Sequence, residues 1–309
     1  MATFITSNPL WKAMKKTLDG ITSEDLSKKQ VCIGKGKLCV TEKMEDGYAD
    51  DIEVAGTTFL TEKDEGTPMA VQGIIVGGTK RYLPKTLALK LSISEEAMED
   101  NKYDKIINAS KRLQKSAYNT QDIDAATVML NGTSTLQGYD NVALFSTSHL
   151  ITAGGTASNC LISSAGGSII GMTPSQAALI QMRIAATLLP GPNGLPDGKR
   201  FTGITFPEAQ YDLWKNITGC ANTVGNNFND LNVTKDYDLD LVPVYWYDAV
   251  TTTFWAGMTD AEDGMRYLIK RPIRGKVWVD NDGEVAHHGV SYRAAIGVSN
   301  WRAFILGAQ

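Results

Sequence analysis

One segment, residues 92–159, restricts the possible folds more than any other part of the sequence. Ser92 and Glu95 have the spacing of a helix capping box, and acidic residues at this point favour the positive end of a helix dipole. A narrow stripe at helical spacing follows, made of Tyr103, Ile106, Ile107, Ser110, Leu113 and Ala117. Thr120 begins a second helical pattern, which Gly132 ends. We therefore predict two successive helices, with one face buried, before a glycine-containing break.

The preceding segment, residues 51–93, has the period of two that is typical of strands. Apolar residues alternate with Thr, Lys, Ala or Ser at Ile52, Val54, Leu60, Leu87, Leu89, Leu91 and Ile93. A charged turn over residues 62–68 separates the two groups, and its glycine and proline supply turn geometry. We predict a hairpin with arms on the order of 40 Å long. Because an isolated ribbon is marginal in water, it needs support from its own sheet or from another subunit.

The rest of the chain mixes short helices and strands, so the expected class is α+β. The predicted elements are a helix over 9–18 with the apolar residues Leu10, Trp11, Met14 and Leu18, a helix over 174–189 capped by Thr173, a strand over 203–207, a helix over 208–217, strands over 242–247 and 253–256, and a hairpin over 276–284. Asp236, Asp238 and Asp240 alternate as if along a strand edge. The N-terminal helix needs a partner surface, either on its own core or on a neighbour.

Composition limits the classes of function. The chain of 309 residues is 43% hydrophobic, yet its apolar runs are far shorter than the roughly 18 residues of a membrane span. Its first residues lack the features of a secretory signal, so we expect synthesis in the cytoplasm and no membrane contact. In a reducing compartment, the cysteines at 32, 39, 160 and 220 are expected as free thiols. A net charge of -4 offers no overall footprint for gripping nucleic acid.

Candidate catalytic and ligand-binding motifs are incomplete. Residues 34–37 resemble part of a phosphate loop but lack its remaining glycines, and Cys32 and Cys39 are too far apart for a typical zinc pair. His287 and His288 are adjacent on a predicted strand, so they face opposite ways. The residues Asp140, Ser146, Ser148 and His149 could supply a hydrolase triad, but no Gly-x-Ser-x-Gly elbow presents the serine. We expect no catalytic residue, cofactor or metal, with a hydrolase using Ser148 and His149 as a minor alternative.

The order of three short motifs resembles a known family. The chain contains Ser94-Glu95-Glu96, then the loop Asp140-Asn141-Val142-Ala143-Leu144-Phe145-Ser146-Thr147-Ser148-His149, then Gly154-Gly155-Thr156-Ala157-Ser158-Asn159. This order is similar to the spine helix and following loop of tailed-phage major capsid proteins with the Hong-Kong-97-type fold. In that family a Ser-Glu-Glu helix precedes an Asp-Gly-x-x-Leu-Phe-Ser-x-x-His loop and a Gly-Gly-x-x-Ser-Asn turn. Asn141 stands here in place of the glycine.

The resemblance implies a division of the chain. It predicts an N-terminal arm over 1–50, an extended β-hairpin loop over 51–92, a peripheral domain with a long spine helix over 93–137 and 270–297, and an axial domain over 138–269 and 298–309. In this family the extended loop lies over a neighbouring subunit, which would answer the hairpin's need for support.

The resemblance also implies the function. It predicts a major capsid protein that assembles with itself, as hexamers and pentamers, into an icosahedral head around the phage genome. The implied partners are a portal, a separate scaffolding protein because the chain retains Met1, a possible decoration protein, and packaged double-stranded DNA without sequence-specific contact. The location is the virion. A shell subunit of a non-viral compartment with the same fold is the main alternative.

The predicted intersubunit contacts come from the arm, the two hairpins and the flanking charges. They are Trp11, Lys15, Glu62, Lys63, Asp64, Glu65, Arg81, Asp280, Asn281 and Asp282. Some members of the family join neighbours through an isopeptide bond between a lysine of the extended loop and an asparagine of the closing hairpin. Lys63 and Asn281 would be the corresponding pair, although Asn281 also has a role in its own turn.

Overall fold

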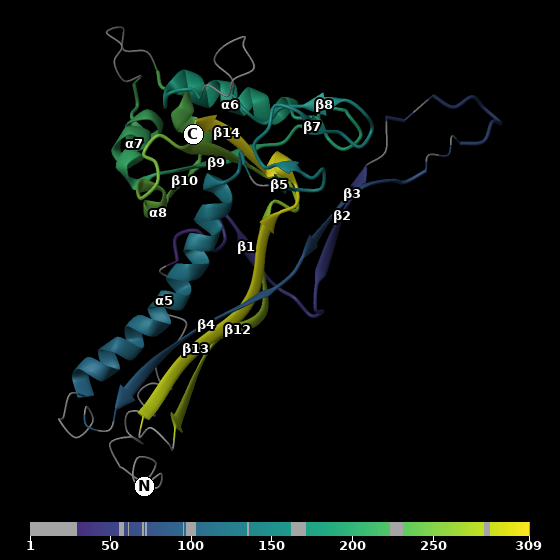
Figure 1. Ribbon diagram of the computed structural model, residues 1–309. Coiled ribbons are helices and arrows are strands. Elements are labelled where there is room, and N and C mark those ends of the chain that lie inside the picture. Colours follow the sequence, from purple (N-terminus) through teal and green to yellow (C-terminus); the bar gives the residue numbers. More distant parts are fainter. Residues whose placement is uncertain are drawn as a thin grey trace.

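The computed structural model describes residues 30–55, 59–60, 62–69, 71, 73–94, 96, 103–134, 136–161, 171–222, 231–280 and 285–308, and every structural statement below concerns these residues. Figure 1 shows three parts: a compact upper part that contains the C-terminus, an elongated lower part in which a long helix runs beside long strands, and a hairpin that projects sideways from their junction. We call these the axial part, the peripheral part and the hairpin.

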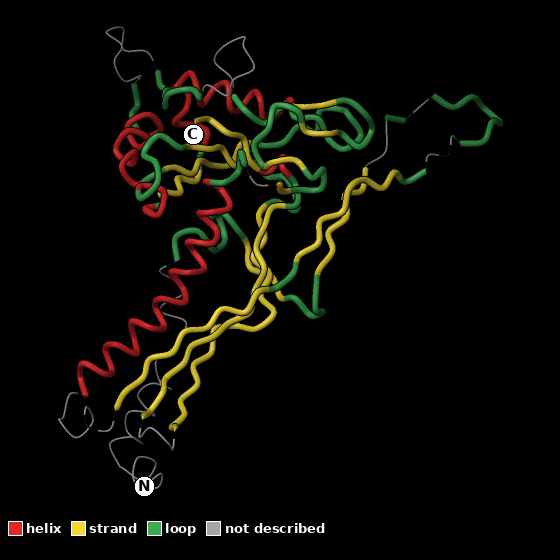
Figure 2. The backbone as a smooth tube through the Cα atoms, in the orientation of Figure 1, coloured by secondary structure: helices red, strands yellow, loops and turns green. Residues whose placement is uncertain are grey.

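The peripheral part is a four-stranded sheet with one helix on it. The strand order is β1 (Val40–Lys43), β12 (Met265–Asp280), β13 (Val285–Val298) and β4 (Lys85–Ser94), with only β1 parallel to its neighbour. Helix α5 (Tyr103–Leu130) contacts β13 and β4. The buried side chains of α5 include Leu113, Ala117, Gln121, Ala125 and Met129, which recur every four residues. The helix therefore lies along one face of this sheet (Figure 2) and turns its buried side chains toward it.

Helix α5 is continuous, whereas the sequence pattern predicted two helices with a new start at Thr120. The Thr120 hydroxyl donates to the Ser116 carbonyl oxygen at 2.8 Å, one turn earlier in the same helix. A threonine that bonds backward in this way remains inside a helix and does not cap a new one. The expected stripe is confirmed at Ser110, Leu113 and Ala117, which are buried. The predicted capping box at Ser92 and Glu95 includes a residue outside the described part of the chain.

The axial part is built on a second four-stranded sheet, which holds most of the aromatic core. Its order is β10 (Asp240–Pro243), β9 (Phe201–Phe206), β11 (Trp255–Thr259) and β14 (Phe304–Ala308). Helices α6 (Gln176–Leu188) and α7 (Tyr211–Gly219) pack around it, and Trp214 and Trp255 lie 4.9 Å apart between ring centroids. The shorter elements are β5 (Leu136–Gln137), β6 (Val142–Ala143), β7 (His149–Leu150), β8 (Thr156–Ala157), α8 (Tyr245–Asp248) and the single turns η1 (Glu208–Gln210), η2 (Val233–Tyr237) and η3 (Trp301–Ala303).

The hairpin consists of β2 (Ala49–Ala55) and β3 (Ile75–Tyr82), which pair antiparallel. The sequence pattern placed Leu87 to Ile93 on its return arm, but those residues belong to β4, which pairs with β13 in the peripheral sheet. The expected hairpin boundary at 92 is therefore too late. The expected peripheral boundary at 270 is likewise late, because β12 begins at Met265. Period-two alternation identifies β4 as a strand but does not specify which strand it pairs with.

Two further elements differ from expectation. The predicted strand over 242–247 ends at Pro243, and the short helix α8 follows it. The carboxylate of Asp248, the last residue of α8, accepts the N–H groups of Glu208 and Ala209 at 2.9 and 3.1 Å. Residues Val233–Tyr237 form η2, and Asp238 has a positive φ of 48°, so the aspartates at 236 and 238 do not alternate along a strand. The helix predicted to begin after Thr173 is capped instead by the Ser175 hydroxyl, which accepts the Ala178 N–H at 3.1 Å.

Candidate functional site

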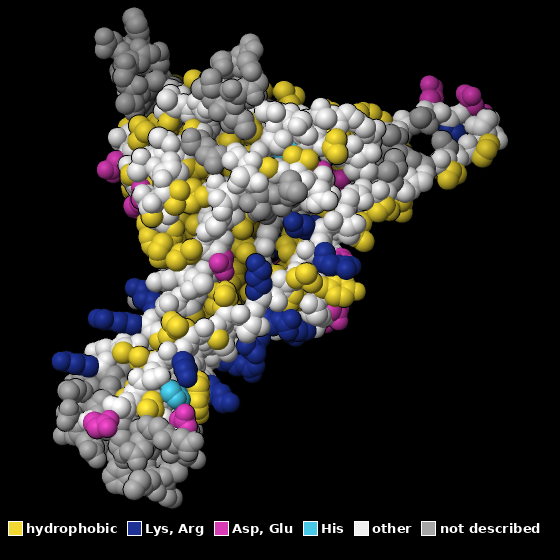
Figure 3. Space-filling view, viewed as in Figure 1, with side chains coloured by type: hydrophobic (Ala, Val, Ile, Leu, Met, Phe, Trp, Pro, Cys, Tyr) yellow, Lys and Arg dark blue, Asp and Glu magenta, His cyan; other side chains and the backbone are white. Residues whose placement is uncertain are grey.

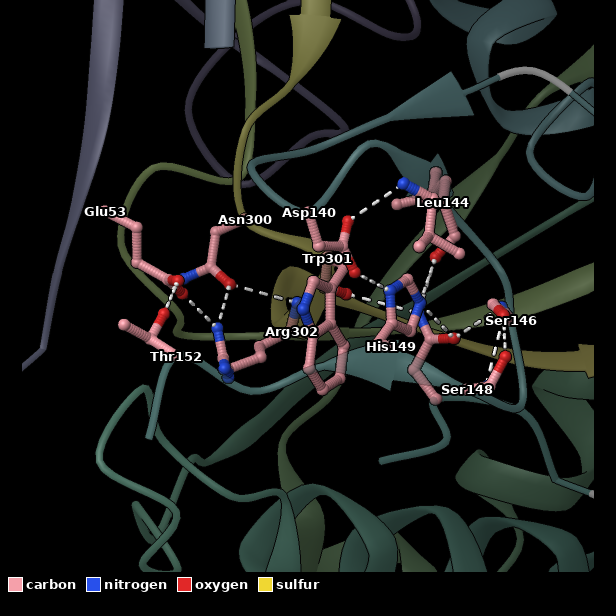
Figure 4. Close-up of polar contacts among 12 residues, drawn as sticks. Glu53, Asp140, Leu144, Ser146, Ser148, His149, Thr152, Asn300, Trp301 and Arg302 are labelled. Carbon is pink, nitrogen blue, oxygen red and sulfur yellow. Dashed lines mark hydrogen bonds and ion pairs between the residues drawn. The ribbon is translucent and has the colours of Figure 1, made fainter. Parts of the chain in front are cut away.

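His149, at the start of β7, is the centre of a buried polar cluster (Figure 4). Its side chain is fully buried, and its Nδ1 lies 2.7 Å from the Asp140 Oδ2. On the other side of the ring, Nε2 lies 3.2 Å from both the Leu144 carbonyl oxygen and the Asn159 Oδ1. Oxygens of these kinds accept hydrogen bonds, so Nε2 carries a proton. Both ring nitrogens therefore face oxygen atoms of the cluster.

Asn159 fixes the orientation of this cluster. Its side-chain N–H group donates to the carbonyl oxygens of Leu144 and Phe304 at 2.7 and 3.0 Å. Its Oδ1 accepts the Ser146 N–H at 3.0 Å as well as facing His149. Every polar atom of the asparagine is therefore used, and the loop after β6 is joined to the C-terminal strand β14.

The same geometry argues against the hydrolase hypothesis. The Ser148 N–H donates to the Ser146 Oγ at 3.1 Å, and the two hydroxyl oxygens lie 3.5 Å apart. The Nε2 that a catalytic base would offer to a serine is instead occupied by Leu144 and Asn159. In the described part of the chain, His149 has the contacts of a structural residue.

Trp301 connects the histidine cluster to a buried arginine. The His149 and Trp301 rings are stacked, with centroids 4.2 Å apart and an angle of 4° between their planes. The Arg302 Cζ lies 4.4 Å from the Trp301 ring centroid, and Figure 4 shows the indole between the imidazole and the guanidinium. Two groups that can carry positive charge thus contact one aromatic ring, which is a favourable arrangement for its negative faces.

Arg302 in turn anchors the hairpin. Its side chain is 1% exposed, its Nη1 donates to the Glu53 Oε1 at 2.7 Å, and its Nε donates to the Pro190 carbonyl oxygen at 2.6 Å. Glu53 lies on β2 and also accepts the Thr152 hydroxyl. The carboxylate is therefore held by one cation and one hydroxyl, both from the axial part.

Glycines allow the other strand of the hairpin to approach equally closely. A Cβ on Gly78 would lie 1.9 Å from the Tyr139 carbonyl oxygen, and one on Gly77 would lie 2.5 Å from the Thr152 Oγ1. Both glycines are on β3, opposite the strand that carries Glu53. Only residues without a side chain fit between this strand and the axial loops.

A second anchor joins the hairpin to the peripheral part. The Asp51 carboxylate accepts the Arg266 Nη1 at 2.6 Å and the Ser299 hydroxyl at 2.6 Å. Arg266 also pairs with Glu42 through its Nε at 3.1 Å, and Tyr82 shares a hydrogen bond with Ser299. Burial raises the pKa of the Tyr82 hydroxyl, which keeps it neutral. The base of the hairpin is thus tied to both other parts of the molecule.

Beyond this base, the hairpin is exposed. Leu60 is 100% and Val71 97% exposed, and Phe59, Met69 and Ile74 are also exposed. The four charged residues Glu62, Lys63, Asp64 and Glu65 lie at the tip, where the Thr67 N–H bonds to the Asp64 carbonyl oxygen. Figure 3 shows acidic and hydrophobic side chains together on this projection. Among the described residues, these apolar side chains of the hairpin are not part of a hydrophobic core.

The other predicted contact residues are distributed over the molecule. Arg81 is engaged at the hairpin base, where it makes two hydrogen bonds of 2.7 and 2.6 Å to Asp50 and lies over Tyr48. Asp280 is exposed at the end of β12, far from the hairpin tip (Figure 1). Four of the predicted contact residues lie outside the described residues: Trp11, Lys15, Asn281 and Asp282. The structure therefore does not test the predicted Lys63–Asn281 pair, because Asn281 is one of them. Whether these residues contact a neighbour stays a prediction.

The sequence reasoning did not identify the anchor residues Glu53, Asp51, Arg266, Trp301 and Arg302. Glu53 and Arg302 are 249 positions apart, and Asp51 and Arg266 are 215 apart, so neither pair has a local spacing to detect. The available signal was the Gly77-Gly78 pair inside a strand pattern, which indicates close backbone approach.

The cysteines and histidines considered as possible ligands have defined environments in the structure. The four cysteines are free, as predicted, and burial raises the pKa of Cys160 to about 12. His287 and His288 face opposite sides of the peripheral sheet, with His287 against Trp278 and His288 near Gly275 and the α5 side. Among the described residues, no group of three or more His, Cys, Asp or Glu side chains could hold a metal ion. None of the described helices combines the length and apolarity needed to cross a membrane.

A spine helix on a long sheet, a compact second part and a projecting hairpin define the Hong-Kong-97-type capsid fold, which confirms the fold expected from the sequence. The chain is similar to the capsid structure of cyanophage P-SCSP1u, with a TM-score of 0.56, 11% identity, and coverage of 87% of this chain and 85% of that one. For a structure from Microbacterium phage Oxtober96 the TM-score is 0.54 and the identity 11%, with 87% and 88% covered.

A third similar structure is the virus-like particle from Pyrococcus furiosus. Its TM-score is 0.51 and its identity 8%, and the match covers 97% of this chain and 99% of that one. No protein-family model matches the sequence, and no curated protein matches it. At sequence identities of 8–11%, these comparisons show that the fold is similar, and the similarity covers 87–97% of this chain.

Proposed function

We propose that this chain is a major capsid protein, the subunit of an icosahedral phage head. The observation that carries the proposal is the exposed hairpin on a fold shared almost end to end with capsid structures. A ribbon with fully exposed apolar side chains is marginal alone, so it gains stability when another molecule covers it. In a shell, each copy supplies a hairpin to one neighbour and receives support from another.

The mechanism is assembly, and the anchored base explains how the hairpin takes part. Glu53 and Asp51 hold its orientation, so the tip is presented at a defined place and less entropy is lost on docking. Many modest contacts then act together, because each subunit is held by several neighbours at once. Hexamers and pentamers would form by head-to-tail contacts around the axial part. The proposed partners are further copies, a portal, a separate scaffolding protein and packaged DNA, with the virion as the location.

Negative-stain electron microscopy of the purified chain, with and without its scaffold, tests this function. Closed shells, tubes, or rings of five or six copies are the expected result. A uniform small oligomer under every condition would contradict it. The nucleic-acid content of particles isolated from infected cells would then separate a phage head from a compartment that carries protein cargo.

A further inference from the structure

The peripheral sheet has one face covered by α5 and one open face. The covered face includes the residues that form a groove with the helix: Leu87, Leu89, Leu113, Ala117, Val290 and Tyr292. Side chains alternate along a strand, and residues opposite each other on paired strands share a face. The intervening residues of β4 and β13, and their partners in β12, therefore lie on the open face.

The open face is basic. Register places Lys90 and Lys276 in one row, Arg274 in the next row, and Arg271 opposite Arg293 in the row after that. We call these five residues the basic face. No position in these three rows is Asp or Glu, and Asp280 lies two rows beyond Lys276 at the end of β12. The charge here is therefore positive although the chain has a net charge of -4, and Figure 3 shows Lys and Arg side chains gathered over the peripheral part.

Trp278 adds an aromatic surface beside these cations. Its ring covers Gly289 so closely that a Cβ on the glycine would lie 2.8 Å from the indole. Because glycine has no side chain, the indole lies directly against the sheet, and it is still 36% exposed. The ring face turned away from the sheet is therefore open to solvent. A groove of about 330 Å³ beside it is lined by Lys90 and Lys276.

A ligand that fits this surface combines negative charges with flat apolar groups. Single-stranded nucleic acid has both, because its phosphates recur along the backbone and each base has a face that can stack on an aromatic ring. Rows on one face of a strand recur every two residues, roughly 7 Å, so the cations form a ladder along an extended backbone. In a duplex the bases are already paired and stacked, and their faces cannot reach an indole.

From this combination we propose that the basic face and Trp278 form a binding site for single-stranded nucleic acid. One base stacks on the open face of the indole. The phosphates on either side of it lie near Lys90, Lys276 and Arg274. An acidic peptide would satisfy the charges but would leave the indole without a stacking partner, which favours nucleic acid.

This activity goes beyond the proposed function, which requires no contact with a single strand. Binding is measured on unassembled subunits, so its result does not depend on shell formation. The covered face of the same sheet lacks such a site, because the groove there contains no Lys or Arg among its described lining residues.

Fluorescence anisotropy of a labelled oligothymidylate of about 12 nucleotides, added to the unassembled full-length chain, tests the proposal. At about 0.1 M salt, we expect the single strand to bind at least about tenfold more tightly than a duplex of the same length. The variant K90E/K276E should lose at least about tenfold in affinity. Its log–log salt dependence should be shallower by about 1.4, because each phosphate contact on a single strand contributes about 0.7.

The stacking residue has its own variants. Trp278→Ala should weaken binding about tenfold, whereas Trp278→Phe keeps a ring and should lose less. The matched control K105E/K111E reverses two exposed charges on α5, on the other side of the sheet, and should bind like the wild type. An equal loss of affinity in this control would mean that any basic surface of the chain suffices, and the proposal would be wrong.

Photocross-linking of the wild type gives a readout that does not depend on folding of the variants. An oligonucleotide containing 5-iodouracil is irradiated with the chain, and the adducts are located by peptide mass spectrometry. The expected adduct is on the peptide that contains Trp278. Adducts confined to peptides of α5 or of the hairpin would overturn the proposal.

Three further results would also overturn it. They are equal affinity for single strand and duplex, equally effective competition by poly-glutamate of matched charge, and unchanged binding in both K90E/K276E and Trp278→Ala. Poly-glutamate competition of that strength would show a general attraction of polyanions. None of these results bears on the capsid function, which particle formation by the wild type decides.

Discussion

At the scale of single residues, the most consequential contacts are buried and polar. His149, Asp140 and Asn159 are joined by hydrogen bonds, and Trp301 places this cluster against Arg302. Buried polar groups stabilise a fold only when each has a partner, and removing one member leaves the others unsatisfied. The cluster is therefore a place where one substitution should affect both the axial part and the hairpin.

We predict that His149→Ala destabilises the chain by about 3 kcal/mol, since it leaves the buried Asp140 carboxylate without its partner. Urea unfolding followed by tryptophan fluorescence measures the change. Ser148→Ala is the matched control, because Ser148 is exposed and makes no contact with the imidazole in the described residues. Its effect should be within about 0.5 kcal/mol. A loss for His149→Ala as small as the roughly 0.5 kcal/mol expected of the control would show that the cluster does not contribute to stability.

Gly78 tests the close contact at the hairpin base. Gly78→Ala should cost roughly 1–3 kcal/mol or displace β3, because the new Cβ would overlap the Tyr139 carbonyl oxygen. Thermal melting and limited proteolysis of the hairpin measure the two effects. Gly73→Ala lies in the same hairpin with nothing within 4 Å of its Cβ and should behave like the wild type. A neutral Gly78→Ala would mean that the strand does not pack against Tyr139 in solution.

At the scale of elements, the hairpin combines a fixed base with an exposed tip. The pairing between β2 and β3 extends to Ala55 and Ile75, and the anchor residues Asp51 and Glu53 lie within the paired part. The apolar residues beyond it contribute exposed surface and no described core. Substitutions at the base of the hairpin should therefore affect stability, and substitutions at its tip should affect assembly.

Replacing residues 57–73 with a short Asn-Gly turn should leave the fold intact and prevent shell formation. The melting temperature is expected to change by less than about 3 °C, because the deleted part has no described core contact. Calorimetry reports stability, and electron microscopy reports particles. Normal shells from the shortened chain would show that the hairpin is dispensable for assembly.

At the scale of the whole molecule, charge is distributed unevenly although the net charge is small. Lys and Arg side chains gather on the peripheral part, while the hairpin tip is acidic (Figure 3). The net charge of -4 therefore conceals a basic surface on the peripheral part and an acidic surface at the hairpin tip. Contacts between copies that use these surfaces should depend on ionic strength more strongly than the fold does.

We expect salt to weaken assembly without lowering stability. Raising the ionic strength from about 0.1 M to 1 M shortens the Debye length from about 10 to 3 Å, which screens exposed charges much more than buried pairs such as Glu53–Arg302. Light scattering should report slower and less complete assembly, while the melting temperature stays constant. Assembly promoted by salt would indicate that apolar contacts dominate the interface.

Local patterns in the sequence were sufficient for several elements. Helical spacing in α5, the charged turn at residues 62–68 and the succession of motifs from Ser94 to Asn159 led to the correct fold. Such features depend on neighbours within a few residues, so periodicity records which side of an element is buried. It does not record the surface against which that side packs.

The partners of each element depended on long-range packing. Strand β4 has the alternation expected of the hairpin's return arm, yet it pairs with β13, and β3, which completes the hairpin, lacks that alternation. Asp248, at the end of α8, accepts the N–H groups of Glu208 and Ala209, so this short helix is joined to a segment 40 and 39 positions earlier. Glu53 and Arg302 meet across 249 positions. These contacts become defined only when burial and hydrogen bonding are satisfied together in three dimensions, which no local spacing specifies.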